Sequence, residues 1–104
     1  MTREETRLAV IGQIETWAEE NGINPTFIGC LEDRHMYADA IIGTMSDPPA
    51  IVYSAQKVVE ALAEMMGGNY EQALEFYEYN TLRGLQYVPK KEYPPVLVDV
   101  LTPF

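Results

Sequence analysis

Two adjacent prolines near the middle of the chain, Pro48 and Pro49, exclude a helix there and separate two apolar runs. The runs, residues 40–45 and 50–53, are rich in β-branched and other apolar residues that favour strands. The prolines follow a Ser-Asp pair, and both residue types are common in turns. We therefore expect the two runs to form a β-hairpin, so that the rest of the chain must fold onto a sheet.

A first amphipathic helix is predicted over residues 3–21. Thr2 and Glu5 have the spacing of a capping box, in which the hydroxyl and the carboxylate satisfy free amide groups. Asn21-Gly22 is a typical helix end, because glycine adopts the left-handed conformation without strain. The apolar stripe expected to face the core consists of Leu8, Ile11, Ile14, Trp17 and Ala18.

Two more helices are predicted after the hairpin, over residues 55–66 and from residue 70 to 82 or 85. Ser54 and Asn69 are suitable N-caps, and a Gly-Gly pair separates the two helices. The residues expected to face the core are Val58, Val59, Leu62, Met65 and Met66 in the first of these helices, and Tyr70, Ala73, Leu74 and Tyr77 in the second.

Two shorter elements complete the pattern. Asn24-Pro25 suits the start of a short helix over residues 26–32. The β-branched run 96–101 follows a pair of prolines and predicts a third strand at a sheet edge. At 104 residues, the chain is expected to form a single domain spanning residues 1–104.

The predicted fold class is α+β, with a small three-stranded, mainly antiparallel sheet and three to four helices packed on it. This arrangement buries every apolar stripe. The side chains expected to meet where the longer helices join are Trp17, Val59, Leu62, Leu74 and Tyr77.

The charge balance is strongly acidic, with 16 Asp and Glu against 7 Lys and Arg and a net charge of −9. The basic residues are scattered, so we expect no direct binding of nucleic acid or of an anionic membrane. The single cysteine, Cys30, excludes an intramolecular disulfide. No apolar run reaches about 18 residues and the N-terminus is charged, so neither a membrane span nor a signal peptide is expected. These features predict a cytoplasmic protein.

The predicted helix that begins at residue 70 carries the candidate binding residues. Glu71, Glu75 and Glu78 share one face, and like charges one turn apart do not strengthen a helix. A solvated face is the ordinary explanation, and a face that binds a partner is the alternative. Tyr79 and Asn80 lie beside this stripe, and exposed aromatic residues are common at interface hot spots. We take these five residues as the candidate partner-binding site.

Catalytic signatures are absent from the sequence. Asp33, His35 and Asp39 have metal-ligand side chains, but they lack a matching second cluster of His or Cys. There is no glycine-rich phosphate loop, no cysteine pair and no nucleophile motif. We therefore expect a protein that is not an enzyme, with no cofactor and no bound metal.

Three motifs resemble those of a set of small, uncharacterised phage and prophage proteins. They are a D-A-h-h-G strand at residues 39–43, where h is hydrophobic, a V-Y-S-x-x-K helix start at residues 52–57, and an E-Q-A-x-E-F-x-E-Y-N helix at residues 71–80. Together they cover about residues 37–82. The resemblance implies an accessory or host-interaction role and no particular reaction.

The leading functional hypothesis is a small, acidic, non-enzymatic protein of phage type that binds a host or phage protein. One version is an inhibitor of a host nucleic-acid-binding defence system, with carboxylates where phosphates would lie. One alternative is a small metal-dependent hydrolase that uses Asp33, His35 and Asp39. Another is a self-associating structural module, a homo-oligomer in which the predicted strand 96–101 pairs with its own copy.

Overall fold

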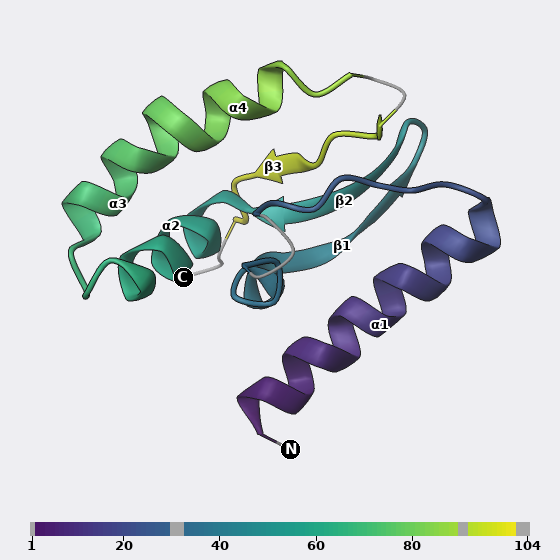
Figure 1. Cartoon of the computed structure of the whole chain (residues 1–104), viewed down its shortest axis with the longest axis horizontal. Coiled ribbons are helices and arrows are strands. Elements are labelled where there is room, and N and C mark those ends of the chain that lie inside the picture. Colours follow the sequence, from purple (N-terminus) through teal and green to yellow (C-terminus); the bar gives the residue numbers. More distant parts are fainter. Residues whose placement is uncertain (1, 30–32, 90–91, 102–104) are drawn as a thin grey trace.

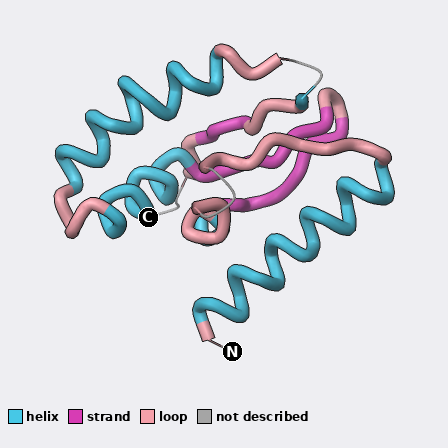
Figure 2. Tube along the Cα trace, in the orientation of Figure 1, coloured by secondary structure: helices cyan, strands magenta, loops and turns pink. Residues whose placement is uncertain are grey.

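A sheet of three strands lies at the centre of the structure, a computed structural model that describes residues 2–29, 33–89 and 92–101 (Figures 1 and 2). Within these ranges the strand order is β1 (Ile41–Ser46), β2 (Pro49–Ser54) and β3 (Val96–Val98). β1 pairs antiparallel with β2, whereas β3 pairs parallel with it. The α+β class is confirmed. The sheet is mixed rather than mainly antiparallel, because β3 returns to β2 after a long helical crossover.

The predicted hairpin is confirmed, and its turn is shorter than expected. β1 extends to Ser46 and β2 begins at Pro49, so that Asp47 and Pro48 form the turn. A bulge between Ile41 and Gly43 interrupts the β1–β2 pairing. The third strand is also shorter than expected, since it ends at Val98 instead of residue 101.

Helix α1 (Arg3–Asn21) has the predicted bounds. The Thr2 hydroxyl accepts a hydrogen bond from the Glu5 amide at 3.1 Å, and Gly22 ends the helix with φ 64°. The predicted buried stripe is partly wrong, because Leu8 is 58% exposed and Arg7 is buried in its place. Arg7 can be buried on this face of α1 because its guanidinium forms an ion pair with the Asp39 carboxylate.

Helix α2 (Ala55–Met65) begins at Ser54, whose hydroxyl accepts a hydrogen bond from the Lys57 amide, as predicted. Its central apolar residues, Val58, Val59 and Leu62, are buried. The prediction is wrong for the final pair, since Met65 and Met66 are each 37% exposed. They lie at the last turn of the helix, where the chain leaves the sheet and reverses at Gly67-Gly68.

The next helical segment has three parts: α3 (Tyr70–Phe76), a π-helical stretch η2 (Tyr77–Thr81) and α4 (Leu82–Gln86). The predicted cap is confirmed, because the Asn69 side chain accepts a hydrogen bond from the Gln72 amide at 3.0 Å. The helical segment begins at Tyr70, as predicted, and ends at Gln86, one residue beyond the later of the two predicted ends. The π-helical turn in its middle was not foreseen.

The buried face of this helical segment is narrower than predicted. Ala73 and Tyr77 are buried, as expected. The prediction is wrong for Tyr70 and Leu74, which are 48% and 38% exposed. α3 packs against α2, so the residues nearest that neighbour are buried while those at the margins face solvent.

The short helix predicted over residues 26–32 is wrong for the part that the structure describes. Residues 24–29 are not helical, and residues 30–32 lie outside the described ranges. Thr26 donates its amide to the Tyr93 carbonyl at 3.2 Å, and Ile28 donates its amide to the Tyr53 hydroxyl at 3.1 Å. These long-range bonds hold the segment in a non-helical conformation and supply hydrogen-bond partners that a helix would otherwise provide. After residue 33 the chain turns and enters a 3-10 helix, η1 (Ala38–Ala40).

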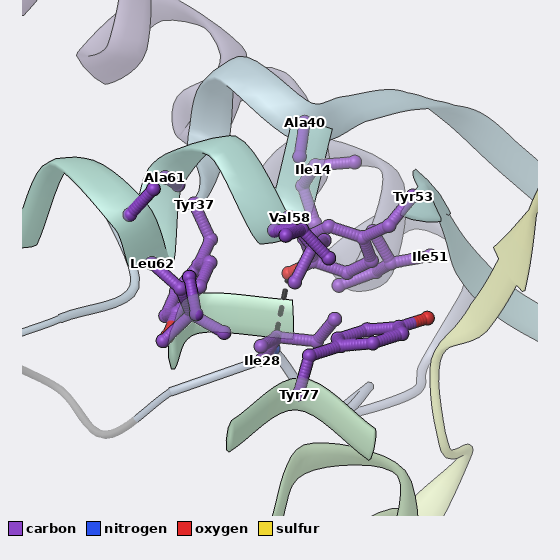
Figure 3. Close-up of a cluster of buried hydrophobic side chains, with 13 residues drawn as sticks. Ile14, Ile28, Tyr37, Ala40, Ile51, Tyr53, Val58, Ala61, Leu62 and Tyr77 are labelled. Atoms are coloured by element: carbon purple, nitrogen blue, oxygen red, sulfur yellow. Dashed lines mark hydrogen bonds between the residues drawn. The ribbon is translucent and has the colours of Figure 1, made fainter. Parts of the chain in front are cut away.

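The core lies where β2, α2 and Tyr77 meet (Figure 3). Tyr53 and Val58 are completely buried, and Figure 3 shows them close to Ile28 and Tyr77. Burial raises the pKa of Tyr53 to about 12. The predicted meeting of Val59, Leu62 and Tyr77 is confirmed. Trp17 lies at the edge of this cluster and is half-buried, whereas Leu74 lies outside it.

Replacing Tyr53 by Phe should lower the free energy of unfolding by about 1–3 kcal/mol, because the buried Ile28 amide would lose its acceptor. Urea denaturation measures this change. Tyr79→Phe is the matched control, since Tyr79 is 56% exposed, and it should shift the free energy by less than about 0.5 kcal/mol. Equal effects of the two substitutions would contradict the role of the Tyr53 hydroxyl.

Candidate functional site

The acidic stripe on α3 faces solvent, on the side of the helix opposite the core. Glu71, Glu75 and Glu78 are exposed, whereas Ala73 and Tyr77 between them are buried. Residues three or four apart lie on the same side of a helix, so the three carboxylates form one row. The stripe therefore presents negative charge directly to solvent.

A hollow of about 400 Å³ lies beside this stripe, between the end of α2 and the helical segment that begins at α3. Three of the five predicted site residues line it, namely Glu75, Tyr79 and Asn80. Glu71 and Glu78 are on the outer row and are not among its lining residues. The predicted site thus consists of two adjoining parts that share Glu75. The residues that line the hollow are Met66, Gln72, Glu75, Phe76, Tyr79 and Asn80.

Three lining residues were missing from the predicted site. Gln72 and Phe76 have helical spacing with Glu75 and Tyr79, so the same periodicity that defined the stripe could have found them. Met66 was assigned to the core, and the chain reversal after α2 places it at the hollow instead. Its position depends on how α2 and α3 meet, which periodicity within one helix does not encode.

The chemistry of the hollow suits a cationic side chain. Phe76 and Met66 are 43% and 37% exposed and offer apolar contact, while Glu75 supplies a carboxylate. A long basic side chain can pack its methylene groups on apolar surface while its charge meets a carboxylate. The Arg83 guanidinium lies 5.4 Å from the centre of the Tyr79 ring, and this cation–π contact stabilises the position of the ring.

The π-helical stretch lies within this surface. It contains Glu78, Tyr79 and Asn80, so its wider turn sets the directions in which three of the predicted site residues point. Such π turns are rare and occur frequently at functional sites. The stretch therefore marks the same part of the helix as the stripe and the hollow.

The structure does not bring Asp33, His35 and Asp39 together as metal ligands, with one another or with any other described side chain. Within the described residues, no group of three His, Cys, Asp or Glu side chains could hold a metal ion. Asp39 instead accepts hydrogen bonds from two arginines of α1, at 2.9 Å from Arg7 Nη2 and 3.0 Å from Arg3 Nε. Its carboxylate is therefore used to attach α1 to η1.

A second carboxylate extends this ion-pair network to α2. Arg3 donates two hydrogen bonds to Glu64, at 2.8 and 2.7 Å, in the parallel geometry that suits a guanidinium and a carboxylate. Hydrogen bonding from Arg7, and then from Arg3, holds the pKa of Asp39 below its usual value, although partial burial opposes this. The bonds from Arg3 likewise lower the pKa of Glu64. The network joins three elements and has a structural role.

Comparison with known proteins gave no relative. No family model matches the chain. Neither the curated proteins nor the solved structures contain a significant match. In the part of the chain that the structure describes, no helix combines the length and apolar character needed to cross a membrane.

Proposed function

We propose that this protein is a small, acidic, non-enzymatic binding protein of phage type, and that it binds a basic surface of a protein partner through α3. The surface consists of the acidic stripe, Glu71, Glu75 and Glu78, together with the adjoining hollow. The net charge of −9 favours encounter with a basic partner, because long-range attraction raises the association rate.

The observation that carries this proposal is the position of Glu75. It belongs both to the row of exposed carboxylates and to the lining of a hollow that contains Phe76 and Tyr79. Interfaces combine aromatic anchors with a charged surround, and this helix offers both on adjoining faces. A face that served only for solubility would need carboxylates and no aromatic-lined hollow.

One form of this function is the inhibition of a host nucleic-acid-binding defence system in the cytoplasm. A protein that holds nucleic acid has a basic surface that contacts phosphates. A row of carboxylates can compete for that surface. The resemblance of residues 39–43, 52–57 and 71–80 to phage and prophage proteins supports a host protein as the target.

Reversing the charge of the stripe, by Glu71→Lys, Glu75→Lys and Glu78→Lys together, should abolish capture of the partner. The full-length chain, immobilised and exposed to nuclease-treated bacterial lysate, should retain a basic protein that raised salt releases. The retained protein should bind labelled DNA, and the wild-type chain should displace that DNA. Quantitative mass spectrometry and fluorescence anisotropy measure the two steps.

The matched control carries the same charge change on α1, by Glu4→Lys, Glu15→Lys and Glu19→Lys, which are also exposed positions. This control should retain the partner, because it preserves α3. Loss of the partner in both variants would show that net charge alone is responsible and would contradict a specific α3 site. Retention in both would exclude the stripe from the interface.

A further inference from the structure

One edge of the sheet is open. β1 pairs with β2 on one side. Within the described residues, no backbone hydrogen bond joins Ile42–Ser46 to a segment other than β2. In an antiparallel pair, alternate residues of each strand direct their N–H and C=O groups away from the partner strand. The outer edge of β1 therefore carries free donors and acceptors at the spacing of a peptide backbone.

A groove of about 290 Å³ runs along this edge, between β1 and α1. Figure 1 shows α1 passing beside β1. The strand contributes four consecutive residues, 41–44. Gly43 has no side chain, so at this residue the groove is lined by the backbone of the strand. The helix side of the groove consists of Val10, Gln13, Ile14 and Trp17.

The residues at this edge do not have the features that usually prevent strands from pairing. The sequence of β1, Ile-Ile-Gly-Thr-Met-Ser, contains neither a charged residue nor a proline. Edge strands are commonly protected by lysine, by proline or by a covering element. Ile42 lies at the bulge between Ile41 and Gly43, is 50% exposed and lines the groove.

We infer that the α1–β1 groove binds an extended, basic segment of a partner protein, which adds to the sheet as a strand next to β1. Strand addition beside a helix is an established mode of peptide recognition, in which the backbone supplies affinity and the side chains supply specificity. Apolar side chains of the segment would contact Trp17 and Ile42. This surface is separate from α3 and does not depend on the function proposed for α3.

Charge selects a basic segment over a second copy of this chain. The groove continues along α1 into a neighbouring hollow through Gln13 and Trp17, and Glu20 lines that hollow. The last turn of α1 contains no basic residue. Two copies that each carry a net charge of −9 repel one another, whereas lysines that flank an extended segment would meet Glu20.

The test uses a synthetic peptide, Lys-Val-Lys-Val-Lys-Val, and an analogue with every interior amide nitrogen methylated. Both carry the same charge, so their difference isolates backbone pairing. Titration of the ¹⁵N-labelled full chain, followed by NMR, should give the largest shifts at the amides of Ile42–Ser46 and the Trp17 indole. The methylated analogue should bind at least about tenfold more weakly.

Gln13→Phe, at an exposed position on α1, should fill the groove and weaken peptide binding at least about tenfold. Gln86→Phe makes the same change at an exposed position that lines neither the groove nor the α3 hollow, and it should leave peptide binding unchanged. The inference is overturned if both peptides bind equally, if the shifts lie on α3 or β3, or if no binding is seen at about 1 mM peptide. Association of the chain with itself through β1, seen by sedimentation, would also overturn it.

Discussion

Leu62→Ala should lower the free energy of unfolding by about 2–5 kcal/mol, which is the range for large-to-small substitutions in a packed core. Leu62 is 4% exposed and belongs to the cluster that joins α2 to β2 and Tyr77. The truncation leaves a cavity that the surrounding strand and helices can fill only in part. A loss of this size is a large share of the roughly 5–15 kcal/mol that stabilises a small domain. Urea denaturation, followed by circular dichroism, measures it.

Leu8→Ala is the matched control for this substitution. The same atoms are removed, but Leu8 is 58% exposed on α1, so the free energy of unfolding should change by less than about 0.5 kcal/mol. Glu75→Gln on the exposed face of α3 should have an equally small effect. If Leu62→Ala unfolds at the wild-type urea concentration, the helix orientations described above are wrong, and so is the α3 binding face.

Asp39→Asn should lower the free energy of unfolding by about 2–3 kcal/mol near neutral pH, because it leaves the buried Arg7 guanidinium without its charged partner. The expected loss lies below the range for a fully buried pair, since the Asp39 side chain is 32% exposed. Asp99→Asn, at an exposed position, is the matched control and should have little effect. Equal losses in the two variants would contradict the role of the ion-pair network.

The effect of Asp39→Asn should depend on pH in a defined direction. The pKa of Asp39 is lower in the folded chain than its usual value of 3.8, so the carboxylate contributes stability above that value. This contribution is lost as the pH falls through the folded pKa, where the carboxyl is protonated in both states. The difference between wild type and Asp39→Asn should therefore shrink in acid. Urea denaturation across a series of acidic buffers tests this, and a constant difference would contradict it.

Local signals in the sequence were sufficient to locate most of the elements. The caps at Thr2, Ser54 and Asn69 lie where the sequence placed them, because a capping side chain binds amides within three residues. The hairpin formed for a similar reason, since Pro48 and Pro49 exclude a helix whatever surrounds them. These predictions needed no knowledge of distant parts of the chain.

Predictions that depended on distant residues were less successful. Residues 24–29 are not helical, because Thr26 and Ile28 bond to Tyr93 and Tyr53 elsewhere in the chain. The parallel pairing of β3 likewise follows from the path of the helices between β2 and β3. Neither the bonds nor the path is encoded by a local pattern of residue types.

The sequence placed the acidic stripe of the candidate site, because helical spacing alone puts Glu71, Glu75 and Glu78 on one exposed face. Tertiary structure decided what lies beside that face: packing of α3 on α2 brought Met66 out of its expected core position and into the hollow. Tertiary structure also decided the role of Asp39. The sequence suggested it as a candidate metal ligand, and in the fold its carboxylate forms ion pairs with Arg3 and Arg7. Periodicity fixes the direction of a side chain relative to its own helix, whereas its partners depend on which other elements the fold brings within reach.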